Sequence, residues 1–159
     1  MKSGIVAMLL MAATLAFGQE EQADPAIDAA SFIELLRSDI KSQKTALMSE
    51  GMAMTEEDAQ AFWPVYREYT FELDKLSDEL LALLKEYAKN YENMTSQKAE
   101  ELAKKNFELQ EKKLKLRKDY FEKVRKTLPP KLAARYLQLD NRINLLYDLQ
   151  LASRVPLVK

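Results

Sequence analysis

An apolar stripe between residues 62 and 87 constrains the fold more than any other feature of the chain. Its members are separated by alternating steps of four and three residues, and they are Phe62, Tyr66, Tyr69, Leu73, Leu76, Leu80, Leu83 and Tyr87. This spacing places every member on one face of an α-helix that packs against other helices. A helix from Glu56 to Tyr91 is about 54 Å long, whereas a compact domain of this size has a radius of gyration of about 14 Å. The stripe therefore predicts an elongated array of helices.

The residues before the stripe carry the start and stop signals of a first helix. Ser31 and Glu34 form a capping box, and the helix that follows ends near Gly51. Its apolar face consists of Phe32, Leu35, Leu36 and Ile40. Glycine and proline are scarce in the whole chain, at three and five residues, so residues that favour helices dominate.

Two more helices follow the stripe. Thr55 is the start signal of the stripe helix itself, and Thr95 caps a third helix that runs to about Lys126. Pro129 and Pro130 end the third helix and open a fourth, which fades near Ser153. The apolar face of the fourth helix consists of Leu132, Tyr136, Leu139, Ile143, Leu146 and Tyr147. We therefore predict an all-α fold, an elongated four-helix antiparallel hairpin or bundle with long helices.

The first 18 residues have the composition of an export signal. Lys2 gives a positive start, the run from Gly4 to Phe17 carries no charge, and Ala16-Phe17-Gly18 precedes the expected cleavage before Gln19. The apolar run is shorter than the ~20 residues of a membrane-spanning helix. We expect a periplasmic or secreted protein with no membrane insertion after cleavage. Its parts are a signal peptide at 1–18, a polar disordered lead at 19–30, a helical domain at 31–154 and an apolar tail at 155–159.

The chain contains no cysteine and no histidine, which removes most of the chemistry of reactive sites. Thiolate and imidazole are the usual ligands of zinc, nickel and copper. Imidazole is also the usual base beside a serine nucleophile, and di-iron helical bundles need Glu-x-x-His. We therefore predict that the protein is not an enzyme and has no catalytic residue, metal ligand or cofactor. Met48, Met52 and Met54 could bind Cu(I) through their thioethers, but methionines beside a glycine more often pack flexibly in a loop.

Charge is distributed unevenly along the chain although the net charge is only −1. Residues 50–101 include 13 acidic and five basic side chains, whereas residues 104–135 include 12 basic and four acidic ones. A basic run of this kind raises the possibility of nucleic-acid binding, but export makes such a partner unsuitable. We expect complementary charges on neighbouring antiparallel helices instead.

The third predicted helix is apolar on two sides. Leu102, Leu109 and Leu116 form one seven-residue row, and Phe107, Leu114 and Phe121 form another. Side chains two residues apart on a helix point ~200° apart, so the rows face in opposed directions. One row can pack on neighbouring helices, while the other needs a dimer partner, a client protein or a covering segment. The alternative is that both rows are core of a bundle.

We expect the second row to form the surface that binds other proteins. Basic residues lie between its members, namely Lys112, Lys113, Arg117 and Lys118. Long basic side chains can cover apolar rows while their charges stay solvated, which suits weak and adaptable binding. Leaving Phe107, Leu114 and Phe121 in water forgoes roughly 1.5–3 kcal/mol for each side chain. We therefore also predict a homodimer with the third helices at or near its two-fold interface.

The helix starts are similar to one another and to those of a known family. Met54-Thr55-Glu56-Glu57-Asp58 is echoed by Met94-Thr95-Ser96-Gln97-Lys98 and by Leu128-Pro129-Pro130-Lys131-Leu132. With the export signal and four helices, the arrangement resembles the small periplasmic family that includes Spy, CpxP, ZraP and CnrX, whose helix starts carry Leu-Thr-x-x-Gln. The resemblance spans about Ser31 to Arg154, with Asp58 and Leu132 where the family has Gln. It implies a cradle-shaped antiparallel homodimer that holds unfolding envelope proteins without ATP, or senses metals and envelope stress.

Three functions are consistent with these features. The first is an ATP-independent chaperone or envelope-stress adaptor that binds unfolded or envelope proteins. The second is a dedicated structural partner of one envelope protein, docked through the apolar stripe or through the tail Val155-Pro156-Leu157-Val158. The third, which the missing histidine and cysteine disfavour, is a metal-responsive sensor that uses the methionines.

Overall fold

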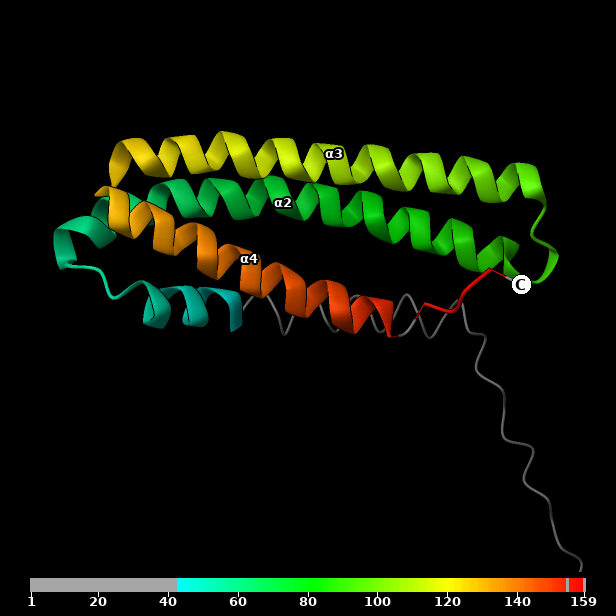
Figure 1. Ribbon diagram of the computed structural model, residues 1–159, viewed down its shortest axis with the longest axis horizontal. Coiled ribbons are helices and arrows are strands. Elements are labelled where there is room, and N and C mark those ends of the chain that lie inside the picture. The colour runs from blue at the N-terminus through cyan, green and yellow to red at the C-terminus, as the bar shows by residue number, and fades with distance from the viewer. Residues whose placement is uncertain (1–42, 154, 159) are drawn as a thin grey trace, which may run out of the picture.

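The chain folds into long helices that lie side by side in an elongated array (Figure 1). The computed structural model describes residues 43–153 and 155–158. Within them, residues 43–52 are helical, and they are followed by α2 (Glu56–Asn90), a short 3-10 turn (Tyr91–Asn93), α3 (Ser96–Thr127) and α4 (Pro130–Ala152). The long helices α2 and α3 pack antiparallel, and the described residues include no strand. The predicted all-α, elongated antiparallel fold is thus confirmed.

The helix ends lie where the local signals place them. Thr55 caps α2 by accepting a hydrogen bond from the backbone N–H of Asp58, and Thr95 caps α3 through the N–H of Lys98. Pro130 occupies the first turn of α4, where a missing N–H costs nothing. The predicted signal peptide, the lead and the first part of the first helix lie outside the described residues.

The core lies at one end of the array, where three helices and residues 43–52 meet. Its centre is a group of aromatic rings whose centroids are 5.2–6.4 Å apart, from Phe62, Trp63, Tyr66, Tyr69, Tyr120 and Tyr136. Met48 and Met52 are fully buried against this group. Met48 and Met52 therefore pack in the core at the end of a helix, whereas Met54 lies in the connection before α2 and packs against the core. Close ring packing of this kind adds stability beyond the area it buries.

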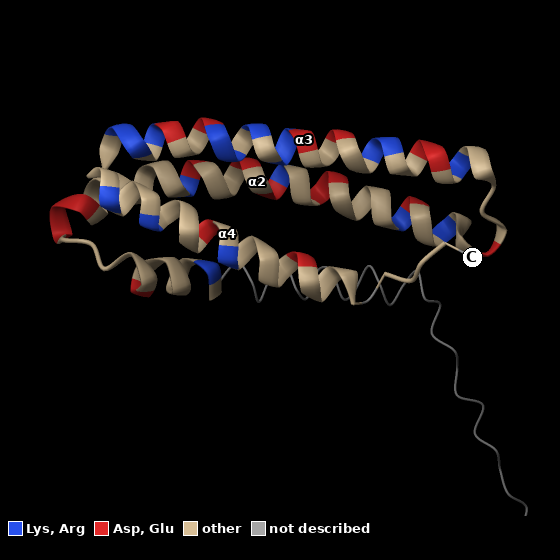
Figure 2. Cartoon of the chain, viewed as in Figure 1, with Lys and Arg blue, Asp and Glu red and all other residues tan. Residues whose placement is uncertain are grey.

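The other end of the α2–α3 hairpin carries most of the ion pairs that join these two helices. The pairs at this end are Lys112–Glu79, Lys105–Glu86 and Lys98–Glu86, and a further pair, Lys123–Glu68, lies beside the core. Figure 2 shows both signs of charge along the two helices. The expected pairing of an acidic segment with a basic one is confirmed. Leu81, Leu102 and Leu109 are the buried apolar side chains of this half.

The fourth helix buries most of its predicted apolar face, because Tyr136 and Ile143 are buried and Leu132 and Leu139 pack against the core. Two features differ from the prediction: Asp140 and Asn144 are buried on the same side of the helix as Tyr136 and Ile143, and Leu146, which was expected to face the core, is 57% exposed. α4 starts beside the end of α3 and diverges from the hairpin toward its own C-terminus (Figure 1). After α4, the chain returns to the hairpin, where the Tyr87 hydroxyl donates a 2.7 Å hydrogen bond to the carbonyl oxygen of Pro156.

Candidate protein-binding groove

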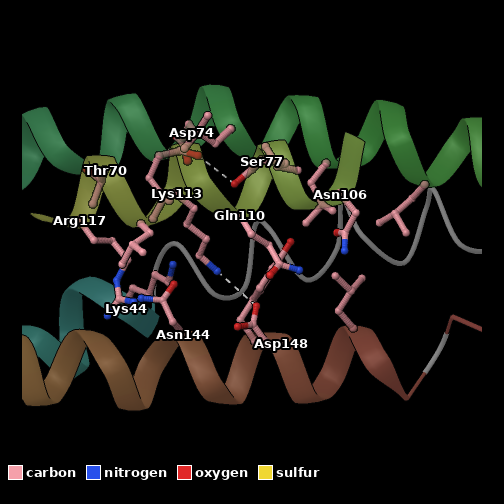
Figure 3. A pocket seen from close by; sticks show the side chains of 18 of the residues that line it. Lys44, Thr70, Asp74, Ser77, Asn106, Gln110, Lys113, Arg117, Asn144 and Asp148 are labelled. Atoms are coloured by element: carbon pink, nitrogen blue, oxygen red, sulfur yellow. Dashed lines mark hydrogen bonds and ion pairs between the residues drawn. The ribbon is translucent and has the colours of Figure 1, made fainter. Parts of the chain in front are cut away.

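A groove of about 630 Å³ lies between the α2–α3 hairpin and the diverging helix α4. Figure 3 shows Lys44, Arg117 and Asn144 at one end and Asn106 toward the other. Residues of α2, α3 and α4 supply its walls, with Lys44 and Thr45 from the helix that precedes α2. The groove forms because α4 contacts α3 near its start and then leaves the hairpin. Its size is within the range of ligand pockets, ~300–1,000 Å³.

The polar end of the groove is organised by the buried carboxylate of Asp140. It accepts hydrogen bonds from the Tyr69 hydroxyl at 3.0 Å, from Arg117 Nε at 2.8 Å and from Asn144 Nδ2 at 3.1 Å. Arg117 also donates to the side-chain oxygen of Asn141. Asp140 thereby joins α2, α3 and α4 through one side chain. Among the described residues, no buried side-chain nitrogen or oxygen lacks a partner, so the network is fully satisfied.

The charges of this network act on the ionisation of its members. Burial lowers the pKa of Arg117, but the hydrogen bond and the negative charge of Asp140 outweigh burial, and the pKa is raised. Burial also raises the pKa of the Tyr69 hydroxyl, and Asp140 raises it further. Arg117 therefore stays charged and Tyr69 stays protonated at every ordinary pH. The network acts as a fixed clamp and has no group poised for proton transfer.

Lys44 is a cation held close to the groove wall. Its Nζ lies 5.9 Å from the centre of the Tyr147 ring, and Lys113 Nζ lies 6.0 Å from the same centre. Burial lowers the pKa of Lys44, and the carboxylate of Asp140 opposes part of this effect. Lys113 in turn pairs with Asp148 of α4 across the groove at 3.3 Å. The polar end thus presents positive charge that is balanced by acidic groups on two helices.

The rest of the groove is apolar and is lined from three helices. The side chains that line it are Leu76, Leu80 and Leu84 of α2, Leu109 and Leu114 of α3, and Leu151 and Val155 at and after the end of α4. Leu76 and Leu80, members of the sequence stripe, therefore line the groove, whereas the first half of the stripe is buried in the core. An apolar trough with a charged end can accommodate an amphipathic segment of another protein.

The three apolar residues of α3 that were predicted to bind other proteins lie in different environments in the structure. Leu114 lines the groove and is 49% exposed, and Phe107, one heptad before it on nearly the same face, is 64% exposed. Phe121 instead packs against the core. Of the three predicted residues, Leu114 lines the groove, Phe107 is exposed and is not among the lining residues, and Phe121 lies beside the core.

The four basic residues between these positions face different neighbours. Lys112 faces α2, where its Nζ lies 2.6 Å from Glu79, whereas Lys113 and Arg117 face α4. Lys118 is exposed. Three of the four predicted basic residues thus carry intramolecular ion pairs, and two of those three line the groove.

Sequence reasoning missed an exposed apolar face on the outer side of α4. Leu145, Leu146 and Leu149 are all more than half exposed. A signal for it was present, because Leu145 and Leu149 are four residues apart and so share a face. The buried Asn144 is a neighbour that faces the other way.

Neither metal binding nor membrane crossing finds support in the described residues. They include no group of three or more acidic, histidine or cysteine side chains that could hold a metal ion. Within the described part of the chain, no helix has both the length and the hydropathy that a bilayer crossing requires.

Comparison of the chain with protein-family models, with curated proteins and with solved structures finds no match.

Proposed function

We propose that the protein is an exported, ATP-independent chaperone or envelope-stress adaptor that holds apolar segments of other proteins in the groove between the α2–α3 hairpin and α4. The observation that carries this proposal is the groove itself, an apolar trough with cations at one end and accessible side chains along its wall. Unfolded proteins expose short apolar segments flanked by charges. Such segments match the trough in chemistry without a demand for one sequence.

The accessible side chains are placed for weak and reversible binding. Phe107 is 64% exposed and Leu114 is 49% exposed, so a client can cover them without first unfolding the helix. Cations that line the groove are already paired with carboxylates, as in Lys113–Asp148 and Arg117–Asp140. They can therefore orient a client, and a client needs no negative charge to bind. Because the groove offers a moderate apolar area and little net charge, it favours weak, adaptable binding over tight binding.

An aggregation assay tests the proposal. Reduced α-lactalbumin serves as an unfolding client, and its light scattering is followed with increasing amounts of the protein and no nucleotide. We expect suppression near equimolar amounts, and a several-fold loss of suppression in Leu114→Asp. No suppression by the unaltered protein at a large excess would refute the chaperone proposal.

A matched control is offered by the outer face of α4. Leu149 is 68% exposed and lies away from the groove, so Leu149→Asp makes the same chemical change on the same molecule. We expect this variant to suppress aggregation like the unaltered protein. Equal losses in Leu114→Asp and Leu149→Asp would show that general surface hydrophobicity, and not the groove, binds the client.

The predicted homodimer is part of the same proposal, with Phe107 as the most exposed member of the predicted row. A phenyl ring that is 64% exposed in the monomer gains stability when a partner covers it. Light scattering at tens of micromolar should report twice the monomer mass, and Phe107→Glu should halve it, since a charge at a two-fold contact appears twice. A monomer at these concentrations would remove the dimer from the proposal.

A second candidate, a dedicated partner of one envelope protein, is favoured by the tail after α4. Leu157 is 88% exposed and Val158 is 52% exposed, while the Tyr87 hydroxyl holds the carbonyl of Pro156. The tail is thus fixed at one point with its apolar side chains free to dock. The apolar stripe offers less, because its first half is buried in the core. Co-purification from the envelope of one stoichiometric protein, lost in Leu157→Asp, would support this candidate over the first.

A further inference from the structure

We propose that the outer face of α4 docks the protein on an anionic lipid surface, where it lies on the bilayer without crossing it. The proposal goes beyond client binding and does not depend on it, because none of the residues of this face lines the groove. It rests on the regular spacing, the exposure and the charge of the side chains that α4 turns away from the core.

The outer face of α4 is a stripe of exposed side chains. Its members are separated by alternating steps of four and three residues, which places them on one face of the helix. They are Lys131, Arg135, Gln138, Arg142, Leu145 and Leu149, with Leu146 beside the last two, and all of them are exposed. From its first residue to its last, the stripe is about 27 Å long. The buried side chains of α4 lie on the opposite face.

No acidic residue belongs to this stripe. The helix has two, and both are engaged elsewhere. Asp140 is buried, and Asp148 lines the groove and pairs with Lys113 at 3.3 Å. The outer face of α4 therefore carries positive charge only.

The cations of the stripe are not neutralised within the chain. Among the described residues, no carboxylate forms an ion pair with Lys131, Arg135 or Arg142. Arg135 Nε donates a 2.5 Å hydrogen bond to the carbonyl oxygen of Gly51, which is a neutral acceptor. These three charges are therefore complementary to a negatively charged partner.

The second half of the stripe is apolar. Leu145, Leu146 and Leu149 are 67%, 57% and 68% exposed, and transfer from water into the acyl region of a bilayer is favourable for such side chains. Arg142 lies one turn before Leu146, so its aliphatic stem can follow the leucines while the guanidinium reaches a lipid phosphate. Leucines beside unpaired cations are typical of helices that bind in the plane of a membrane interface.

A second copy of the chain fits this face less well. A stable interface takes ~20–30 residues from each partner, whereas the stripe and Leu146 together offer seven. In a two-fold contact the face would also meet itself, and it brings no acidic group to the other copy. The stripe is convex, being the outside of a helix, so a broad anionic surface can contact its whole length at once.

Flotation with lipid vesicles tests the proposal on the full exported chain. The vesicles contain either phosphatidylcholine alone or phosphatidylcholine with one third phosphatidylglycerol. We expect several-fold stronger binding to the anionic vesicles, and this preference should decrease with added salt. Arg142→Gln should weaken binding to the anionic vesicles about five-fold. Leu149→Asp should weaken it roughly ten-fold or more, because it removes an apolar contact and adds a negative charge.

The groove variant Leu114→Asp is the matched control, because it makes the same chemical change at another exposed leucine. We expect it to bind vesicles like the unaltered protein. If the unaltered protein does not float with anionic vesicles, the proposal is overturned and the face is left to an acidic protein partner. Equal binding by Leu149→Asp and the unaltered protein would overturn the assignment to α4.

A labelled cysteine shows which face meets the lipid, because the chain has no cysteine of its own. An environment-sensitive dye is attached to Leu149→Cys or, as a control, to Lys104→Cys on α3, where the native side chain is 69% exposed. We expect anionic vesicles to shift the emission to the blue at position 149 and to leave it unchanged at position 104. Equal shifts at the two positions would mean that no particular face docks.

The aggregation assay without vesicles separates this proposal from the proposed function. Leu149→Asp should suppress aggregation normally while it fails to float, and Leu114→Asp should show the opposite pattern. A protein that floats but suppresses nothing would retain the lipid-binding face and lose the chaperone proposal. A protein that suppresses but does not float would lose the lipid-binding face alone.

Discussion

Replacing Asp140 should remove more stability than any surface charge of this protein. The carboxylate is 6% exposed and accepts hydrogen bonds from Tyr69, Arg117 and Asn144. Asp140→Ala leaves the guanidinium of Arg117 without its anion, because the side chain of Arg117 is only 21% exposed. It also leaves the buried hydroxyl of Tyr69 without an acceptor. Each of these groups lost its contact with water on folding, and in the variant it also loses the hydrogen bond or ion pair to Asp140 that offset this loss.

The magnitude follows from the geometry of the network. Removing one partner of a buried ion pair costs about 3–5 kcal/mol. This is a large share of the total stability of a domain, about 5–15 kcal/mol. Asp140→Asn keeps an oxygen acceptor but loses the charge, so we expect a cost of about 1–3 kcal/mol. The double variant Asp140→Leu/Arg117→Leu should cost less than the sum of its single variants, because it removes both charges together.

Urea unfolding measures these differences. The single tryptophan, Trp63, packs edge-on against Phe62 and Tyr66, so its fluorescence reports on the core, while circular dichroism reports on the helices. The midpoint should fall in Asp140→Ala with the slope unchanged. A loss below about 1 kcal/mol, or additive single and double variants, would refute the argument that this carboxylate joins the three helices.

Three further predictions concern other parts of the chain. Hydrogen bonds from Lys105 and Lys98 hold the pKa of Glu101 at about 2, below its ordinary 4.5. Because the folded pKa is depressed, this pairing stabilises the fold above pH 4.5 and is lost as the pH falls toward 2; thermal unfolding should show the loss, and Glu101→Gln should show less of it. Burial lowers the pKa of Lys44 below 10.5, so its charge disfavours folding, and stability should rise as the pH approaches 10.5 from below. Lys44→Met should therefore raise the melting temperature at pH 7, and an unchanged or lower value would contradict this. The exported protein should begin at Gln19, as intact mass can show, and a mass that includes Met1 would contradict the signal peptide.

The helices could be predicted from the sequence because their signals are local. Thr55, Thr95 and Pro130 stand at helix starts, and each acts through its own backbone neighbourhood. The pairing of acidic and basic segments was also predictable, since antiparallel neighbours bring the two segments together. Neither inference depends on knowing which residues meet across the fold.

The burial of Asp140 and the exposure of Leu146 on α4 could not be predicted in the same way. A pattern based on hydrophobicity points Leu146 toward the core and Asp140 toward water. The structure does the reverse, because Tyr69 lies 71 residues away in sequence and Arg117 lies 23 away, and both supply donors to Asp140. A buried carboxylate is stable only with such partners. Partners this distant in sequence are invisible to a local pattern.

The sequence indicated an exposed apolar residue that lines the groove, but it did not predict that a groove would form. Phe107 and Leu114 were recognised as apolar positions in need of cover, and both are exposed, but only Leu114 lines the groove. The opening itself depends on the divergence of α4, which is a property of helix packing. Phe121 was grouped with them by its spacing, but it lies beside the core, where the helices are still close.

The division of the hairpin into an aromatic end and an ion-paired end has a consequence for how the molecule opens. Local opening is cheapest where few apolar contacts are lost. The region of Leu81 and Leu102 has little buried apolar surface, so its backbone amides should exchange with solvent deuterium through partial opening. The amides around Tyr69 and Tyr136 should exchange only when the whole chain unfolds. Added salt, which weakens ion pairs and leaves ring packing intact, should widen that difference in exchange rate.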